Sequence, residues 1–248
     1  MILVKGLSKR FEGHQVLKTL NLEVEKGETM VVMGRSGCGK SVLLKLIMGL
    51  LEPDEGEIWV DGQEITNLTE KQMDQVRKRF GMVFQSSALF DSLTVGENVG
   101  FSLSRHTDMD RKQVGQVVGE KLQLVGLRGI EDVMPVDLSG GMKKRVSLAR
   151  AISMDPEIIL YDEPTTGLDP ITADEINRLI AELHARLKVT SIVVTHDMKS
   201  AFSVGTKMAM LHDGKIIASG TPGEFRENTE PIVRGFLAQE ALDVKSNT

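Results

Sequence analysis

The chain has 248 residues, of which 41% are hydrophobic and 26% charged, a composition that excludes a disordered or fibrous protein. The formal net charge of −5 does not indicate a protein built mainly to bind nucleic acid. The single cysteine excludes an intramolecular disulfide and favours a reducing compartment. No apolar run approaches the roughly 20 residues of a membrane helix, and we expect no signal peptide.

Short apolar runs alternate with helical patterns, which predicts an α/β domain with a parallel sheet. Buried strands are predicted at residues 29–33, 158–161 and 191–195, and a further strand at 82–85. A helix over residues 41–51 is apolar nearly all round, so we expect it to be buried. The pairs Asp61-Gly62 and Asp213-Gly214 follow short apolar runs and predict β-hairpins.

Between residues 85 and 155 the strand signals fade, and helical patterns such as 111–124 predict a mostly helical insertion. No internal repeat or low-complexity tract interrupts the chain. Near the C-terminus one helical stripe is apolar, formed by Ile232, Val233, Phe236 and Leu237. This stripe either packs on its own domain or serves a second copy or an accessory subunit.

Residues 34–41 read GRSGCGKS and match the pattern G-x-x-x-x-G-K-[ST] between a predicted strand and a predicted helix. Glycines let successive backbone N–H groups point at phosphate oxygens, and the following helix adds its positive end. Lys40 would reach the β- and γ-phosphates, and the Ser41 hydroxyl would bind Mg²⁺. A chance Gly-rich turn would match on the order of once in a hundred such chains. The phosphate-binding residues are therefore Gly34, Arg35, Ser36, Gly37, Cys38, Gly39, Lys40 and Ser41.

Two adjacent acids, Asp162 and Glu163, end the predicted strand at 158–161. Adjacent strand residues point to opposite faces, so the two carboxylates can serve different purposes. Asp162 would hold Mg²⁺, and Glu163 would polarise the attacking water. An ordinary strand-end turn is the alternative, and the upstream phosphate loop favours the catalytic interpretation.

Residues 138–142 read LSGGM and precede a helix. Alone, the segment is an ordinary helix start with Ser139 as the N-cap. Combined with the phosphate loop, the acid pair, PTTGLDP at 164–170 and Thr195-His196, it resembles the ATP-binding cassette (ABC) family over nearly the whole chain.

The resemblance implies a P-loop NTPase (RecA-like) core with an antiparallel β-subdomain and a helical insertion. The implied parts of this single domain are the core with its β-subdomain at 1–86 and 155–225, a helical subdomain at 87–154, and a C-terminal helix and tail at 226–248.

The same resemblance implies roles for individual residues. Phe11 stacks on adenine, Gln85 meets Mg²⁺ and the attacking water, and His196 touches the γ-phosphate. Three signature residues complete the ATP site of the opposite copy in a homodimer, and Asp169 lies at the dimer seam; the signature residues are Ser139, Gly140 and Gly141. The expected catalytic residues are Glu163, His196, Lys40 and Gln85; the metal ligands are Ser41, Gln85 and Asp162; the cofactors are ATP and Mg²⁺.

Met142 departs from the glutamine that commonly ends the signature. This ending, with GRSGCGKSVLLK, SSALFDSLTV and TTGLDPITAD, is similar to cassettes of the Mla/Mce-type lipid transporters. That likeness implies an ATPase moving phospholipid between bacterial membranes from the cytoplasmic face of the inner membrane. The implied partners are an integral-membrane permease, an MCE-domain protein and a STAS-domain protein, with no nucleic acid.

The segment at 86–101 is expected either to dock the permease or to pack within its own domain, through Leu89, Phe90 and Leu93. An importer of a polar solute such as an amino acid shares the general motifs. A soluble, non-transport cassette would carry a long coiled-coil insertion or a second cassette. A small-molecule kinase would lack LSGGM and the Thr195-His196 pair.

Overall fold

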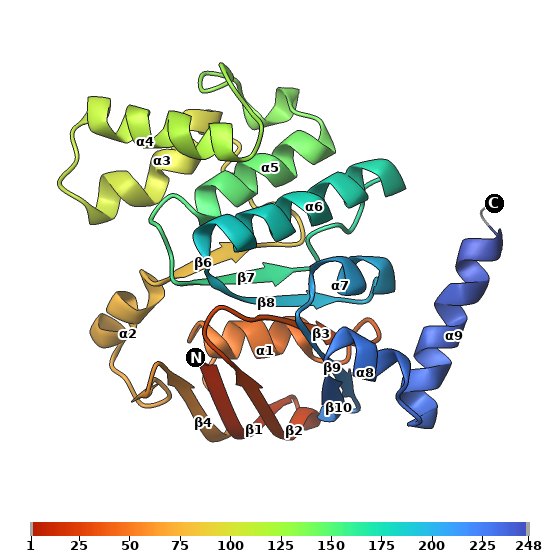
Figure 1. Ribbon diagram of the computed structural model, residues 1–248. Coiled ribbons are helices and arrows are strands. Elements are labelled where there is room, and N and C mark those ends of the chain that lie inside the picture. Colours follow the sequence, from red (N-terminus) through yellow and green to blue (C-terminus); the bar gives the residue numbers. More distant parts are fainter. Residues whose placement is uncertain (1, 247–248) are drawn as a thin grey trace. The chain divides into compact units, whose positions relative to one another are not determined.

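The computed structural model describes residues 2–246, with side chains through residue 238. The chain forms two compact units, one comprising the residues up to 69 with those from 192 onward, the other residues 70–191. Each unit combines strands and helices, and Figure 1 labels these elements along the chain. No helix of the described residues is both long enough and apolar enough to cross a membrane.

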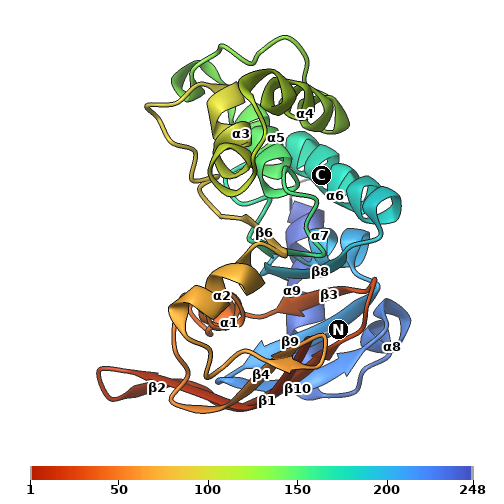
Figure 2. The same ribbon diagram turned by 90° about the vertical axis from the view of Figure 1, so that its left-hand side faces the viewer.

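The first unit contains an antiparallel sheet with the strand order β2-β1-β4-β5. Its strands are β1 (Ile2–Phe11), β2 (His14–Val24), β4 (Glu55–Val60) and β5 (Gln63–Glu64). β1 and β2 lie side by side in both views of the ribbon (Figures 1 and 2). The hairpin between β4 and β5 turns at Asp61-Gly62, as the sequence predicts, because both residues adopt a positive φ.

Irregular pairing distinguishes β1 and β2. Gly6 inside β1 has φ 59° and Thr19 inside β2 has φ 52°, and the register shifts between Val4 and Leu7. Such bulges break the alternation of inward and outward side chains. For this reason the apolar pattern of these two long strands is not a simple period of two, and the sequence reasoning missed both.

The same unit holds the strands β10-β9-β3, with β3 parallel to β9 and β9 antiparallel to β10. β3 spans Thr29–Met33 as predicted and is buried at every position, while β9 (Lys207–His212) and β10 (Lys215–Gly220) form the predicted hairpin. The helices are α1 (Lys40–Ile47), α7 (Met198–Val204), α8 (Pro222–Arg226) and α9 (Pro231–Ser246). α1 is shorter than predicted because Met48 caps it and Gly49, with φ 62°, follows.

β8 (Thr190–Thr195) begins in the second unit and continues into the first. The predicted C-terminal stripe lies on α9, where Val233 is fully buried while Ile232 remains 40% exposed. Phe236 and Leu237 are half-buried. At least Val233 therefore packs within its own chain.

The second unit pairs β6 (Phe80–Val83) with β7 (Ile158–Asp162) in parallel, with Val83 opposite Tyr161. Its helices are α2 (Glu70–Arg77), α3 (Val95–His106), α4 (Arg111–Leu124), α5 (Gly140–Ala151) and α6 (Pro170–Leu187), with a 3₁₀ turn η1 at Pro135–Asp137. Every regular element described between β6 and β7 is helical, so the predicted helical insertion is present.

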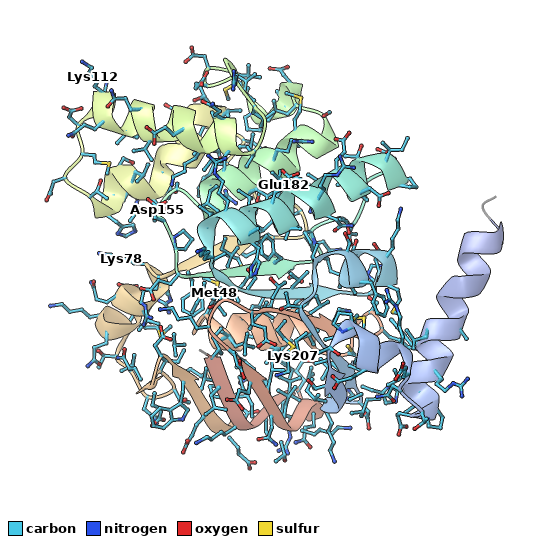
Figure 3. The ribbon with its side chains drawn as sticks, viewed as in Figure 1. Met48, Lys78, Lys112, Asp155, Glu182 and Lys207 are labelled. Carbon is cyan, nitrogen blue, oxygen red and sulfur yellow. The ribbon has the colours of Figure 1, made fainter. Side chains whose placement is uncertain are left out.

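Within this unit α3, α4 and α5 pack against one another, and α6 lies beside α5 (Figures 1 and 2). Capping boxes at Thr94 and Asp110 begin α3 and α4. Polar side chains cover the outer faces, as Lys112 on α4 and Glu182 on α6 illustrate (Figure 3).

Candidate functional site

The predicted phosphate loop joins β3 to α1 in the first unit. Gly34 has no room for a side chain, because a Cβ atom there would lie 2.4 Å from the carbonyl oxygen of Leu211. Gly39 adopts φ 106°, and its Cβ would lie 2.9 Å from Leu17 Cδ2. Glycine is therefore required at Gly34 by the close approach of the Leu211 carbonyl and at Gly39 by the positive φ at the start of α1.

Lys40 is the first residue of α1 and only 5% exposed. Its Nζ donates to the carbonyl oxygens of Gly34 at 2.8 Å and Arg35 at 3.2 Å. The N-cap residue Gly39 provides no side-chain cap for α1. The helix therefore begins with backbone N–H groups that lack a side-chain cap, beside a buried ammonium. This combination is suited to an anion of high charge density.

Two further predicted residues lie in this unit. Phe11 ends β1 and remains 38% exposed, with Lys9 Nζ 5.5 Å from the ring centroid. His196 directly follows β8 and is exposed, one residue before Asp197, which caps α7. Phe11 thus presents ring surface that a planar ligand could cover.

In the second unit, the acid pair lies at the carboxyl end of β7. Asp162 and Glu163 are 8% and 7% exposed. β7 ends at Asp162, while Glu163 adopts φ 48° and begins a turn, so strand alternation orients only the first acid. The direction of Glu163 is set instead by its left-handed backbone, a strained conformation typical of functional sites.

Gln85 follows β6, the strand parallel to β7, so both segments leave the same edge of the pair. β6 ends at Val83, earlier than predicted, and Gln85 lies two residues beyond it with an exposed side chain. Its carbonyl oxygen accepts a hydrogen bond from Lys144 Nζ at 2.5 Å. Burial lowers the pKa of Lys144, and the charges of Asp162 and Glu163 oppose that shift.

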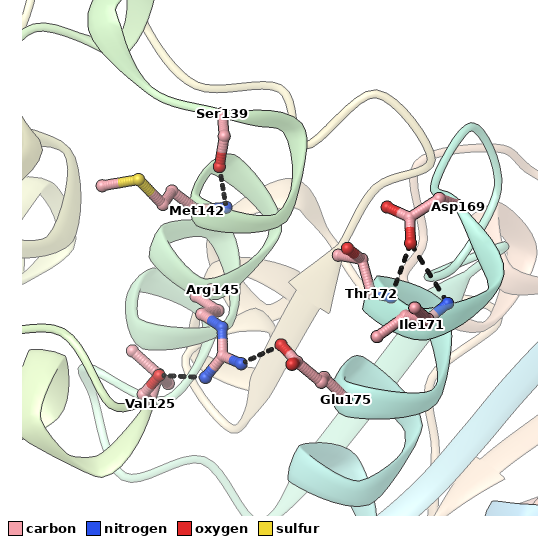
Figure 4. A network of polar contacts seen from close by, with 8 residues as sticks. All are labelled: Val125, Ser139, Met142, Arg145, Asp169, Ile171, Thr172 and Glu175. Carbon is pink, nitrogen blue, oxygen red and sulfur yellow. Dashed lines mark hydrogen bonds and ion pairs between the residues drawn. The ribbon is translucent and has the colours of Figure 1, made fainter.

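The predicted signature residues and Asp169 line one hollow of about 370 Å³. Ser139 caps α5, since its Oγ accepts from the N–H of Met142 at 3.3 Å. Asp169 caps α6, accepting from the N–H groups of Ile171 at 3.1 Å and Thr172 at 3.0 Å (Figure 4). The Thr172 hydroxyl, followed by these backbone bonds, lowers the pKa of Asp169. The N-termini of two helices therefore face a single hollow.

The N-cap interpretation of Ser139 and an anion-binding role are compatible. The cap bond uses an oxygen lone pair, and the O–H hydrogen is a separate donor. Gly141 keeps the hollow open, because a Cβ there would lie 2.7 Å from Thr172 Cγ2. Arg145 lines the wall and donates to Val125 O and Glu175 Oε2, both at 2.9 Å (Figure 4).

A second hollow of about 380 Å³ adjoins the segment at 86–101. Its lining includes Phe84, Ala88, Phe90, Phe101 and Arg150. The rings of Phe90 and Phe101 lie 4.6 Å apart, and Phe90 remains 44% exposed. This surface is apolar, with a guanidinium at its edge.

Sequence reasoning missed three polar residues that organise this region: Asn98, Lys144 and Arg150. Asn98 and Lys144 are buried, and Arg150 is half-buried. One signal in the sequence could have indicated Lys144. It shares a helical stripe with Ser147, Leu148 and Ala151, which are all buried, and a lysine on a buried stripe is unusual.

The expected metal ligands are a hydroxyl, an amide and one carboxylate: Ser41, Gln85 and Asp162. Oxygen donors of this kind suit Mg²⁺, which retains water and phosphate oxygens in its coordination sphere. Among the described residues, no three His, Cys, Asp or Glu side chains form a group that could hold a metal unaided. Ser41 belongs to the first unit, and Gln85 and Asp162 to the second, so this set of metal ligands stays a prediction.

A family profile described as "ABC transporter" matches residues 17–166. The chain is 44% identical, over 97% of its length and 91% of the relative, to the intermembrane phospholipid transport system ATP-binding protein MlaF of Haemophilus influenzae. It is 41% identical, over 95% of its length and 68% of the relative, to the probable ribonucleotide transport ATP-binding protein mkl of Mycobacterium leprae.

Solved structures with the same fold include a dimeric, post-hydrolysis state of the ATP-binding cassette MJ0796 bound to ADP and Pi. That chain is 33% identical, with a TM-score of 0.82 over 89% of this chain and 98% of the other. The cassette cbiO1 from Clostridium perfringens is 29% identical, with a TM-score of 0.82 over 96% and 98% of the two chains.

Proposed function

The chain belongs to the ABC transporter family, and we propose that it is the subunit whose ATP hydrolysis drives phospholipid transport between bacterial membranes. The observation that carries the proposal is the hollow onto which α5 and α6 direct their N-termini. The start of α5 favours a phosphate group there through the Ser139 hydroxyl and the backbone N–H groups of Gly140 and Gly141, whereas the N–H groups that begin α6 already bond to Asp169. We infer that a second copy of the chain supplies that phosphate, since a 33% identical cassette is dimeric.

The proposed active form is a homodimer in which each hollow receives the γ-phosphate of ATP held by the partner's phosphate loop. Each copy then contributes the same two surfaces, as twofold symmetry requires. The cassette structure that is dimeric and bound to ADP and Pi, 33% identical to this chain, supports a nucleotide-bound homodimer. Closure with ATP and reopening after hydrolysis supply two states that a membrane partner can follow.

Hydrolysis would use residues from both units. Lys40 neutralises charge on the β- and γ-phosphates, and Phe11 stacks on adenine. Glu163 and Gln85 orient the attacking water, while His196 contacts the γ-phosphate. Bound Mg²⁺, held by Ser41, Gln85 and Asp162, would neutralise charge on the transferred phosphoryl group.

The cargo rests on the relatives and on the subfamily resemblance. Phospholipid is named for the MlaF relative and ribonucleotide for the mkl relative. The Met142 signature and the neighbouring stretches favour the lipid system. Its permease, an MCE-domain protein and a STAS-domain protein are the proposed partners, with the ATPase bound at the cytoplasmic face of the inner membrane.

The permease is proposed to dock at the hollow beside residues 86–101. Phe90 offers apolar surface, and Asp91 next to it is exposed and charged. Phe90→Ala should weaken assembly with the permease and reduce the coupling of ATP hydrolysis to transport, with basal ATPase activity retained. Unchanged assembly would count against this docking site.

Glu163→Gln tests the hydrolytic assignment. Loss of a general base typically costs about 10²- to 10⁴-fold in rate, so turnover should fall by that amount while ATP binding persists. With ATP the variant should accumulate as a dimer, measurable by light scattering. Glu182→Gln, on the exposed face of α6, is the matched control and should hydrolyse normally. Hydrolysis by Glu163→Gln at the wild-type rate would contradict the assignment.

Proteins that co-purify with the tagged chain from membranes test the cargo. A permease accompanied by an MCE-domain protein is expected for lipid transport. A periplasmic amino-acid receptor in their place would favour the polar-solute importer and overturn the lipid proposal.

A further inference from the structure

Two cations on α5 bind the backbone of the loop that carries Gln85. Lys144 Nζ donates to the carbonyl oxygen of Gln85 at 2.5 Å and lies 3.5 Å from that of Phe84. Arg150 donates to the carbonyl oxygens of Ser87 at 2.8 Å and Ala88 at 2.6 Å. Four of the five carbonyl groups at residues 84–88 therefore accept hydrogen bonds from one helix.

The loop that these cations hold is strained. Ser87 has φ 63° and Ala88 has φ 46°, both in the left-handed region although neither is glycine. Such residues are strained and persist only where the surrounding structure imposes them. Arg150 bonds the carbonyls of these same two residues, so the helix supplies the restraint that this loop conformation requires.

Burying the charged ammonium of Lys144 costs free energy, which a residue with a purely structural role could avoid. The Lys144 side chain is 4% exposed, and an ammonium is costly to remove from water unless it is paired. The charges of Asp162 and Glu163 offset part of that cost. The lysine therefore links the acid pair, the Gln85 loop and α5 through one buried charge.

α5 connects this loop to the signature hollow. Ser139 caps the helix, and Lys144 lies five positions further, about 7.5 Å along the axis at 1.5 Å per residue. Arg150, near the other end of α5, lines the proposed docking hollow. A displacement at the N-terminus of α5 would therefore move the groups that hold residues 84–88.

We propose that Lys144 is a positioning residue for ATP hydrolysis: it fixes the backbone of Gln85 to the signature helix, so that the hollow at Ser139–Gly141 and the loop at 84–88 move together. Arg150 extends the same link to the docking hollow. The inference rests on the proposed roles of Gln85 and of the signature residues.

Lys144→Met tests this link by keeping the side-chain length and removing the charge and the donors. We expect kcat to fall about tenfold or more while the KM for ATP stays within about twofold, because geometry is lost and not ground-state binding. More Mg²⁺ should be needed for half-maximal rate, and hydrogen exchange in a peptide covering residues 84–90 should accelerate. Lys144→Arg, which keeps donors, should restore most of the rate.

Lys121→Met is the matched control, since Lys121 is another buried lysine of the same unit, paired with Asp155 and 7% exposed. It should lower the melting temperature without changing the Mg²⁺ dependence or the exchange at 84–90. Melting temperatures of all variants separate lost folding from lost positioning. Wild-type kcat and wild-type exchange in Lys144→Met would overturn the proposal.

A double-mutant cycle with Gln85→Ala shows whether Lys144 acts through Gln85. If it does, Lys144→Met causes little further loss of kcat in the Gln85→Ala background; full additivity would overturn the proposed link. An unaltered Mg²⁺ dependence in Gln85→Ala alone would instead refute the proposed role of Gln85. In that case hydrogen exchange at 84–90 still decides whether Lys144 holds the loop.

Discussion

Replacing Asn98 of α3 tests whether its side chain holds the proposed docking segment in place. The side chain is fully buried. Its Oδ1 accepts from Phe90 N at 2.8 Å, and its Nδ2 donates to the carbonyl oxygens of Phe90, Leu93 and Thr94 at 3.1, 3.0 and 3.0 Å. One amide thus bonds four backbone groups before and at the start of α3, its two N–H hydrogens being shared among three carbonyl oxygens.

The cost of Asn98→Ala follows from which of these groups keep another partner. The Phe90 carbonyl still accepts from Leu93 N at 3.1 Å, and the Thr94 carbonyl still accepts from Asn98 N at 2.9 Å. Among the described hydrogen bonds, Phe90 N and the Leu93 carbonyl have none besides Asn98. At about 1–3 kcal/mol for each unsatisfied group, two groups correspond to about 2–6 kcal/mol. In a protein of this size that lowers the melting temperature by about 4–24 °C.

Thermal and urea unfolding of the nucleotide-free protein measure this effect. Ser104→Ala on the same helix is the control, because its hydroxyl bonds Phe101 O at 3.0 Å on an exposed face and should matter by less than about 0.5 kcal/mol. Asn98→Ala should also lose more permease-stimulated than basal ATPase activity. If Asn98→Ala and Ser104→Ala have the same melting temperature, the reasoning that the four bonds hold the segment is refuted.

Two other predictions concern the phosphate loop and pH. Gly34→Ala should reduce ATP affinity and stability, because its Cβ would meet the Leu211 carbonyl. The control is Gly115→Ala in α4, whose Cβ would meet no atom within 4 Å and which should be neutral or stabilising by up to about 1 kcal/mol. Nucleotide titration and melting curves compare the two variants. Burial lowers the pKa of His184 below its ordinary value of 6.5, although a hydrogen bond with the Val189 backbone opposes the shift. The unfolded chain then binds the proton first, so stability falls as the pH drops through 6.5 toward the folded pKa. His184→Gln should flatten the stability–pH curve in that range, and an unchanged slope would contradict this origin.

Local signals predicted the strands and turns that depend on neighbouring residues alone. β3 begins and ends as predicted because Thr29 and the four apolar residues that follow it are buried together. The hairpin at Asp213-Gly214 follows from the positive φ that both residues adopt. β1 and β2 could not be predicted, because bulges at Gly6 and Thr19 interrupt the alternation on which strand patterns depend.

The candidate site divides in the same way. Spacing alone indicated the residues of the phosphate loop and the signature, since each motif is a short turn before a helix. Lys144 and Arg150 bind carbonyls 59 to 63 positions earlier in the chain. Such contacts depend on tertiary packing that no local pattern encodes. The roles of Lys144 and Arg150 therefore follow from the position of α5 beside the loop at 84–88 and could not be predicted from the sequence.

The charge of the chain explains why the proposed dimer should need ATP. Two copies at −5 each repel one another at distances up to roughly the Debye length of about 8 Å in physiological salt. Within the signature hollow, Arg145 is paired with Glu175, and Asp169 is a third charge of negative sign. Side-chain charge therefore does not make the hollow attractive to phosphate. At the start of α6, Pro170 has no N–H group and those of Ile171 and Thr172 already bond to Asp169, so the backbone N–H groups at the start of α5 must do so. Their field fades within about one helical turn, so it acts only on a phosphate already carried into contact by the partner. An empty partner brings like charge and no phosphate, whereas a partner loaded with ATP brings the one group that the start of α5 can bind.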